Sequence, residues 1–271
     1  MKIYKWSGAG NIFAVMDGRG SDASAFRREG TVREICSRFG TDGFMILNQS
    51  LAGRDFAMEF YNPDGSGGMM CGNGGRCIAA FAKYLNLPQK EEGLYVFDAP
   101  DGEHSAKLLS RDSENAWTVR LRMKDVQGVR EMLGGLFLNT GTRHFVLRVP
   151  DVEKVDVASE GAALRGRSEF APEGSNVNFL DASDGIIRVR TFEKGVEAET
   201  MACGTGITAS AIAAYKWGLP PFGTDSDGRV HYALKARRDN LLVDFIPKKE
   251  DAFESVFLTG PAELLSREEF V

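Results

Sequence analysis

Two cysteines, Cys71 and Cys203, each stand directly before glycines at the predicted start of a helix. The first lies in "CGNGGR" and the second in "CGTG". A cysteine at a helix start faces backbone N–H groups that have no acceptor within the helix, and it lies at the positive end of the helix dipole. Both effects favour the thiolate, so we expect the pKa of each thiol to lie below its ordinary value.

The glycines give each of these helix starts a second capability. A backbone without side chains can close around a small anion and direct its N–H groups at a carboxylate. Two such elements, related by approximate twofold symmetry, could hold one molecule between two sulfurs. Inverting a stereocentre beside a carboxylate needs such a pair, because a base removes the α-proton from one face and an acid returns a proton to the other. N–H donors aimed at the carboxylate would stabilise the charge that develops.

The similarity between the two segments extends well beyond the cysteines. Residues 60–88, "FYNPDGSGGMMCGNGGRCIAAFAKYLNLP", align without a gap with residues 192–220, "FEKGVEAETMACGTGITASAIAAYKWGLP". The leading Phe, a Met, Cys-Gly-x-Gly, two helix alanines and the closing Leu-Pro coincide. Each segment follows an alternating run of strand character, "RDFAMEF" or "GIIRVRTF". We interpret the match as a duplicated domain, against the alternative of chance similarity between two helices.

The two predicted helices are apolar on most faces, which is typical of helices at the centre of a domain. Alternating or β-branched runs predict further strands at "NIFAVMD", "GFMILNQ", "LYVFDAP", "AWTVRLRM", "RHFVLRV", "SNVNFLD", "LLVDFIP" and "SVFLTGPAELL". Additional helices are predicted at "TVREICSRFG" and "ASEGAALRG". The polar stretch from Leu108 to Ala116 is interpreted as a linker between the halves. The expected fold is α/β (α+β), with one domain of residues 1–112 plus 257–271 and another of residues 113–256.

The composition excludes several classes of function. The 271 residues are 43% hydrophobic and 26% charged, as in a soluble globular protein with a sizeable core. A formal net charge of −5 gives no basic footprint for nucleic acid or an anionic membrane. No apolar run is long enough to cross a membrane, and "MKIYKWSGAG" lacks the apolar stretch of a signal peptide. We therefore expect a cytoplasmic protein with a small-molecule substrate.

The sequence predicts no cofactor and no metal. Three histidines are too few for a histidine-based metal centre, and the four cysteines have neither zinc-ligand spacing nor the pattern of a disulfide framework. The glycine runs lack G-x-G-x-x-G spacing, and no Walker lysine follows them. Cys36, in a predicted amphipathic helix, and Cys77, off the helical face of Cys71, are interpreted as structural.

These motifs together resemble the diaminopimelate epimerase family. "NPDGS" followed by "CGNGGR", and later "ETMACGTG", are similar to its two signature blocks, and "SGAGNIF", "FGTDGF", "TGTRH" and "SNVNF" support the match. The resemblance implies two similar domains, each with strands wrapped around a central helix, and an active site in the cleft between them. It implies cofactor-independent, two-base epimerisation of LL- to meso-diaminopimelate in bacterial lysine and peptidoglycan precursor synthesis. It also implies a homodimer.

The resemblance assigns roles to matching residues. Cys71 and Cys203 become the catalytic acid and base. The residues expected to bind substrate are, for the reacting carboxylate, Gly72, Asn73, Gly204 and Thr205; for general contacts, Asn11, Asn62 and Asn176; for the amino group beside the reacting carbon, His144 and Glu193; and for the distal end, Thr142 and Lys194.

Several positions depart from the family pattern. The family usually has His-Gly-x-Gly-Asn-Asp-Phe near the start, and here Ser7 and Ile12 replace the His and the Asp. Thr142 stands in the block where Gly-Asn-Pro-His is expected, and Lys194 replaces an arginine. Since Thr142 and Lys194 match positions that contact the distal end, they bear on substrate identity. A two-cysteine racemase or epimerase of another amino acid is therefore an alternative, although proline racemases usually have Cys-Gly-His where Asn73 stands. A thiol redox or metal-binding protein is the alternative from another class.

Overall fold

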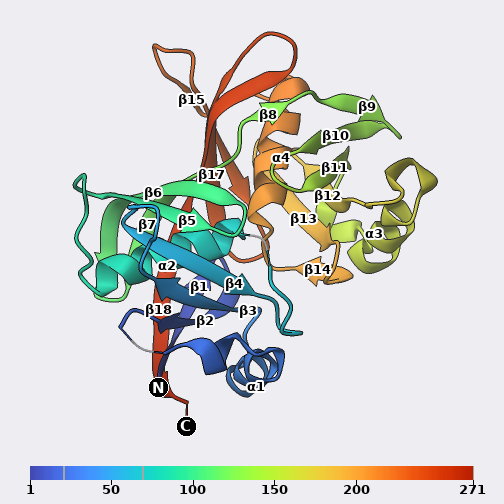
Figure 1. The fold of residues 1–271 in the computed structure, drawn as a ribbon. Helices are drawn as coiled ribbons and strands as arrows, with labels where there is room; N and C mark the ends of the chain where they lie inside the picture. The colour runs from blue at the N-terminus through green and yellow to red at the C-terminus, as the bar shows by residue number, and fades with distance from the viewer. Residues whose placement is uncertain (21, 69, 271) are drawn as a thin grey trace. The chain divides into compact units, whose positions relative to one another are not determined.

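The computed structural model describes residues 1–20, 22–68 and 70–270 (Figure 1). The chain divides into two compact units, residues 1–121 with 260–271 and residues 122–259. The expected domain boundaries, after residues 112 and 256, fall slightly before these divisions. Met69, which the repeat alignment includes, lies outside the described residues.

The first unit is a sheet closed around a central helix. Its strands are β1 (Lys2–Gly8), β2 (Asn11–Asp17), β3 (Gly43–Asn48), β4 (Phe56–Tyr61), β5 (Leu94–Ala99), β6 (Gly102–Ser113), β7 (Ala116–Arg122) and the second half of β18 (Ala252–Glu269). Consecutive strands pair from β1 to β7, with β2–β3 and β4–β5 parallel and the others antiparallel. Because β18 pairs with both β7 and β1, the sheet closes on itself.

Helix α2 (Gly72–Tyr84) lies inside this closed sheet and contacts β1, β2, β3 and β6. Every residue from Gly72 to Ala82 is buried. The helix is therefore central, as its all-round apolar composition predicted. A second helix, α1 (Glu29–Phe39), follows the short 3-10 helix η1 (Ser24–Arg27) and packs on β2 and β3.

The second unit repeats this plan around helix α4 (Gly204–Lys216). Its strands are β8 (Val126–Gln127), β9 (Arg130–Met132), β10 (Gly135–Asn139), β11 (Arg143–Arg148), β12 (Asn176–Asp181), β13 (Ile187–Glu193), β14 (Ala198–Thr200), β15 (Gly223–Thr224), β16 (Val230–Lys235), β17 (Asn240–Pro247) and the first half of β18. The pairing order is β9-β10-β11-β12-β13-β16-β17-β18-β8, with β11–β12 and β13–β16 parallel. Its other helices are α3 (Val157–Arg165) and the 3-10 helices η2 (Val152–Lys154) and η3 (Ser168–Phe170).

Helix α4 contacts strands from β10 to β13 as well as β16 and β17, and Figure 1 shows it (orange) beside β10–β12. Both central helices have 13 residues and end in the same way. Asn86 and Gly218 adopt positive φ angles of 54° and 69° just beyond the two helices. The next residue, Leu87 or Leu219, donates its N–H back to the helix at 3.0 Å in both units. The sequence repeat is thus a repeat of backbone structure.

The predicted strands and helices are all present, and the expected α/β fold is confirmed. The predicted linker from Leu108 to Ala116 is wrong. These residues form the end of β6, a tight turn and the start of β7, with Arg111 opposite Trp117. Their polar character reflects the exposure of this end of β6 on both faces of the strand.

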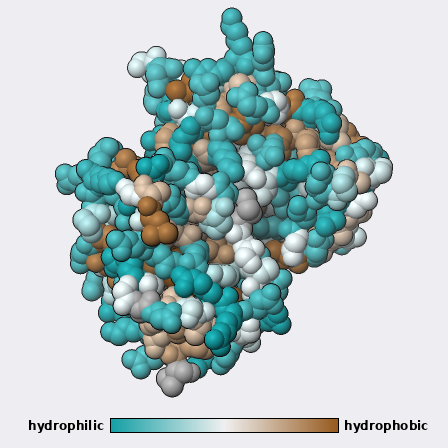
Figure 2. Space-filling model, in the orientation of Figure 1, coloured by the Kyte–Doolittle hydropathy of each residue, from teal (hydrophilic) through white to brown (hydrophobic). Residues whose placement is uncertain are grey.

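The surface agrees with the composition. On the face shown in Figure 2, hydrophilic residues predominate and hydrophobic residues occur in small separate groups. Among the helices of the described residues, none has the length and apolar composition needed to span a membrane.

Candidate active site

Cys71 and Cys203 are the N-cap residues of the two central helices. Cys71 has φ −98° and ψ 133°, and Cys203 has φ −104° and ψ 109°. The carbonyl of each cysteine accepts the first helical hydrogen bond, from Gly75 at 2.7 Å and from Ile207 at 2.8 Å. Neither side chain caps its helix by a hydrogen bond. The predicted position of both cysteines at a helix start is therefore confirmed, and each lies at the positive end of a helix dipole.

Glycines allow other elements to approach both helix starts closely. A Cβ atom at Gly8 of β1 would lie 2.7 Å from the carbonyl oxygen of Asn73. A Cβ atom at Gly206 of α4 would lie 2.4 Å from Oδ1 of Asn178 and 3.3 Å from Cε1 of His144. Since real Cβ atoms do not approach other atoms so closely, glycine at these two positions lets the strands pack directly against the first helical turn.

In the first unit, a buried network supports the start of α2. Nη2 of Arg76 donates to Oδ1 of Asn73 at 2.9 Å, and Nδ2 of Asn73 donates to Oδ1 of Asn11 at 2.7 Å. Nδ2 of Asn11 in turn donates to Asp42 at 3.3 Å. Arg76 and Asn73 are fully buried, and the Arg76 guanidinium also donates to the Pro261 carbonyl at 3.3 Å. Two predicted site residues, Asn11 and Asn73, are thus joined by their side chains.

Asn62 shapes the loop that leads from β4 towards Cys71. Its backbone N–H donates to the Ser66 carbonyl at 2.9 Å, and its Nδ2 donates to Oγ of Ser66 at 3.0 Å. An asparagine in such a turn commonly has this structural role. Its predicted contact with substrate stays a prediction.

In the second unit, five of the predicted residues form one continuous network. Sγ of Cys203 lies 3.4 Å from Oγ1 of Thr205, and this hydroxyl lies 2.9 Å from Nε2 of His144. Oγ1 of Thr142 lies 2.9 Å from the same nitrogen and 3.1 Å from Oγ1 of Thr205. Nδ2 of Asn176 reaches Oγ1 of Thr142 at 3.4 Å. Contacts among β11, β12 and α4 thus bring five of the predicted residues together.

His144 is fully buried at the centre of this network. Its Nδ1 lies 3.1 Å from Nδ2 of Asn178. Burial lowers the pKa of His144 to about 3, so the ring is neutral near pH 7. Because both ring nitrogens have partners within the unit, a contact with substrate would require one of these bonds to be exchanged. The role predicted for His144 at the substrate amino group stays a prediction.

Asn176, Glu193 and Lys194 lie at adjoining strand ends. Oδ1 of Asn176 accepts from the backbone N–H of Lys194 at 2.8 Å, and its Nδ2 donates to the Arg143 carbonyl at 3.0 Å. Lys194 is exposed, and its Nζ donates to the Glu173 carbonyl at 3.0 Å. Glu193 is the half-buried last residue of β13. Asn176 therefore holds the start of the Lys194 loop against β11.

The structure adds two residues that the sequence interpretation missed. Asn178 bonds to His144 and accepts from Oγ1 of Thr191 at 2.9 Å. A signal for it was present, because Asn176 and Asn178 are two residues apart on a predicted strand and share a face. Arg76 was part of the quoted "CGNGGR" motif, but nothing local indicated that its guanidinium would be buried.

The other two cysteines are in the core. Cys36 is 3% exposed and Cys77 is fully buried. Burial raises the pKa of the Cys77 thiol to about 12 and raises the pKa of the Cys36 thiol as well. Both environments are those of structural cysteines.

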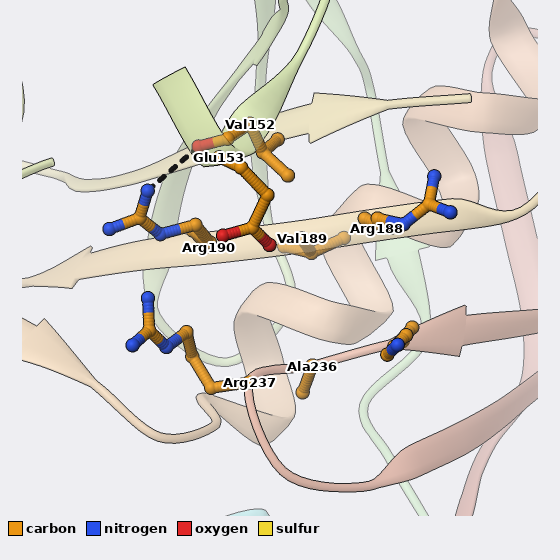
Figure 3. Close-up of a pocket in the computed structure, with 8 residues that line it drawn as sticks. Val152, Glu153, Arg188, Val189, Arg190, Ala236 and Arg237 are labelled. Carbon is orange, nitrogen blue, oxygen red and sulfur yellow. Dashed lines mark hydrogen bonds between the residues drawn. The ribbon is translucent and has the colours of Figure 1, made fainter. Parts of the chain in front are cut away.

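A cavity of about 240 Å³ in the second unit is separate from the predicted site residues (Figure 3). Its cationic side chains are Arg188, Arg190, Lys235 and Arg237. Arg188 forms an ion pair with Asp184, while Arg190 and Arg237 both approach Glu199. Since the three arginines have acidic partners, the cavity is not a ready-made anion site. Among the described residues, no group of three or more His, Cys, Asp or Glu side chains could hold a metal ion.

Comparison with solved structures identifies the architecture. A PhzF-family phenazine biosynthesis protein from Bacillus anthracis matches with a TM-score of 0.77 at 12% identity, covering 100% of this chain and 99% of the other. A hydroxyproline epimerase from Agrobacterium vitis matches with a TM-score of 0.67 at 14% identity, covering 99% and 91%. At this level of identity, the likeness concerns the fold alone.

Comparison with other sequences identifies the family. The diaminopimelate epimerase family model matches residues 3–125 and 136–233. The diaminopimelate epimerase of Flavobacterium psychrophilum is 37% identical, with 98% of each chain covered. That of Aquifex aeolicus is 39% identical, covering 96% of this chain and 94% of the relative. The chain therefore belongs to the diaminopimelate epimerase family.

Proposed function

We propose that this protein interconverts LL- and meso-2,6-diaminopimelate, the reaction of lysine and peptidoglycan precursor synthesis. One observation carries the proposal: in a chain of this family, each unit has a cysteine as the N-cap of its buried central helix. The same backbone geometry at both sites supplies two equivalent places for acid–base chemistry at a carbon beside a carboxylate.

Each helix start has two parts in the reaction. The helix dipole and nearby N–H groups favour the thiolate form of Cys71 or Cys203, which makes the sulfur a competent base near neutral pH. The backbone N–H groups of the residues that follow are the donors to the reacting carboxylate; they belong to Gly72, Asn73, Gly204 and Thr205. As the α-proton leaves, negative charge develops on the carboxylate, and these donors stabilise it.

The two thiols act on opposite faces of one α-carbon. One sulfur, as thiolate, removes the α-proton, and the other, as thiol, delivers its proton to the opposite face. After turnover the protonation states of Cys71 and Cys203 are exchanged, so the enzyme is ready for the reverse reaction. Acid, base and charge stabilisation all come from the chain, and the proposal includes no cofactor.

Incubation of the purified protein with LL-diaminopimelate in heavy water tests reaction and substrate together. We expect deuterium to appear at an α-carbon as the meso isomer forms, and we expect chelators to leave the rate unchanged. Cys71→Ala and Cys203→Ala should each abolish epimerisation, while the matched changes Cys36→Ala and Cys77→Ala should retain it. Full activity in Cys203→Ala would contradict the two-base mechanism. Absence of exchange in the unaltered protein would favour a thiol redox or metal-binding role.

A second substrate class is favoured by one observation. The Thr142 hydroxyl, at a position expected to contact the distal end of diaminopimelate, instead bonds to His144 and Thr205. Comparing α-proton exchange of diaminopimelate with that of lysine, histidine and glutamate decides between the two classes. Faster exchange with an amino acid that lacks the second amino-carboxylate end would replace diaminopimelate with that substrate.

The proposed function also includes a cytoplasmic homodimer, as the family resemblance suggests. Sedimentation of the purified protein at the concentration used for assay tests the dimer. A monomer with full activity would remove the homodimer from the proposal.

A further inference from the structure

The first unit contains a chain of side-chain hydrogen bonds with a cation at one end and a carboxylate at the other. Nη2 of Arg76 donates to Oδ1 of Asn73 at 2.9 Å, and Nδ2 of Asn73 donates to Oδ1 of Asn11 at 2.7 Å. Nδ2 of Asn11 then donates to Oδ2 of Asp42 at 3.3 Å. The chain thus links the first turn of α2, the start of β2 and the loop before β3.

The charged groups at the two ends determine how both amides between them are oriented. An asparagine amide has nearly the same shape in two orientations, which its hydrogen-bond partners must distinguish. A guanidinium has only donors, so the oxygen of Asn73 faces Arg76 and its NH₂ group faces Asn11. A carboxylate only accepts, so the NH₂ group of Asn11 faces Asp42 and its oxygen faces Asn73. Neither amide can turn over without placing two donors or two acceptors against each other.

Asn11 is the member of the chain that the proposed function places at the substrate. It is the half-buried first residue of β2. Among the described residues, its side chain forms only the two bonds given above, so one N–H group and one oxygen lone pair stay available. We infer that Arg76 is a positioning residue that acts through Asn73 to fix the orientation in which the Asn11 amide meets the substrate. The inference rests on the proposed function, since an overturned Asn11 would offer the substrate an acceptor in place of a donor.

Backbone groups hold both ends of the chain in place. Arg76 is fully buried, and its guanidinium also donates to the Pro261 carbonyl at 3.3 Å and to the Gly72 carbonyl at 3.4 Å. Oδ2 of Asp42 accepts the backbone N–H of Ile12 at 2.8 Å, and the backbone N–H of Asp42 donates to the Ile12 carbonyl at 2.7 Å. A charge is costly to bury without partners, so these bonds keep the guanidinium at one position. The amides of the chain are therefore oriented before substrate binds.

Two substitutions of Arg76 separate positioning from stability. Arg76→Lys lacks the fork that reaches the Pro261 and Gly72 carbonyls but keeps a donor for Asn73, whereas Arg76→Met has no donor. We expect the KM for LL-diaminopimelate to rise about tenfold in Arg76→Met, the effect of losing one hydrogen bond to substrate, with kcat nearly unchanged. In Arg76→Lys the rise should be less than about threefold, because Asn73 keeps its orientation. Equal KM values in the two variants would overturn the inference, whatever their urea midpoints.

Asn73→Asp decides the question if Arg76→Met does not fold. The new carboxylate still accepts from Arg76 but has no hydrogen to donate to Asn11, so the Asn11 amide must turn over. We expect a KM rise of about tenfold here as well. Asn86→Asp makes the same chemical change at an exposed residue just beyond the other end of α2, and it should leave KM unchanged. An unchanged KM in Asn73→Asp would overturn the inference.

Nitrogen-15 NMR of the Asn11 side-chain NH₂ group tests the chain without substrate. Its resonances are assigned by their loss in Asn11→Ala. We expect them to move in Asn73→Asp and Arg76→Met but to stay close to their original positions in Arg76→Lys, although Arg76 itself bonds to Asn73 and not to Asn11. Resonances that do not move in Asn73→Asp would overturn the inference. Resonances that move as expected in a protein without any epimerase activity would reject the proposed function alone.

Discussion

Acidification should destabilise the second unit through His144, which is buried in its neutral form. An unfolded histidine has a pKa near 6.5, whereas burial lowers that of His144 to about 3. Between these values the unfolded chain binds a proton that the folded chain does not, so the free energy of unfolding falls as the pH falls. The slope approaches about 1.4 kcal/mol per pH unit, which gives a loss of roughly 2–3 kcal/mol between pH 7.5 and 4.5.

Urea unfolding at several pH values, followed by circular dichroism, measures this contribution. His144→Gln keeps a polar side chain at this buried position, but glutamine cannot take up the proton. We expect the variant to be less stable at neutral pH and to lose less stability than the unaltered protein as the pH falls. His231→Gln, at a half-buried histidine of the same unit, is the matched substitution. Equal slopes for His144→Gln and the unaltered protein would refute the assignment of a neutral buried ring.

Three further predictions concern packing and charge. Arg76→Met should reduce the free energy of unfolding by about 3–5 kcal/mol, because buried acceptors lose a charged donor. The control Arg33→Met, at an exposed ion pair, should reduce it by less than about 1 kcal/mol. Similar urea midpoints for the two variants would contradict this prediction. Gly206→Ala should reduce the free energy of unfolding by about 1–3 kcal/mol and so lower the melting temperature, because its Cβ would lie 2.4 Å from an amide oxygen of β12. Gly30→Ala, in a helix with open space around it, should raise it slightly. Lys194→Ala should change the free energy of unfolding by no more than about 0.5 kcal/mol, because the side chain is exposed. A fall in kcat/KM for diaminopimelate would therefore report a contact between Lys194 and the substrate. An unchanged kcat/KM would exclude that contact.

The features that the sequence predicted well are local ones. A cysteine followed by Gly-x-Gly and an apolar run specifies a helix start within a few residues, and both starts lie where the pattern placed them. Alternating strands such as β4 and β13 were likewise visible because one face of each is buried. The end of β6 was misread as a linker because its residues are exposed on both faces, so no alternation marks the strand. Its strand conformation comes from pairing with β7, which is a non-local interaction.

The same distinction applies to the candidate site. The cysteines and their helix starts could be predicted, but the partners of the sulfur in the second unit come from other strands. His144 lies opposite Asn176 in the parallel β11–β12 pair, and this register brings Nδ2 of Asn178 within 3.1 Å of Nδ1 of His144. Register depends on how two distant segments pair, which the spacing of residues within either segment does not reveal. The burial of Arg76 was hidden for the same reason, because its acceptors include a carbonyl of β18.

The two halves of the repeat differ at the second residue after each cysteine. In the first unit this residue is Asn73, whose side chain bonds to Arg76 and Asn11 inside the protein. In the second unit it is Thr205, whose hydroxyl lies 3.4 Å from the sulfur of Cys203. The duplicated backbone offers the same N–H donors at both helix starts, but the side chains give the two sulfurs different neighbours. Two bases that exchange roles in each turnover need not have equal thiol pKa values, and an inequality would bias which one is the thiolate in the resting enzyme. Alkylation of Cys71 in a Cys203→Ala background, compared with Cys203 in a Cys71→Ala background, measures that inequality directly.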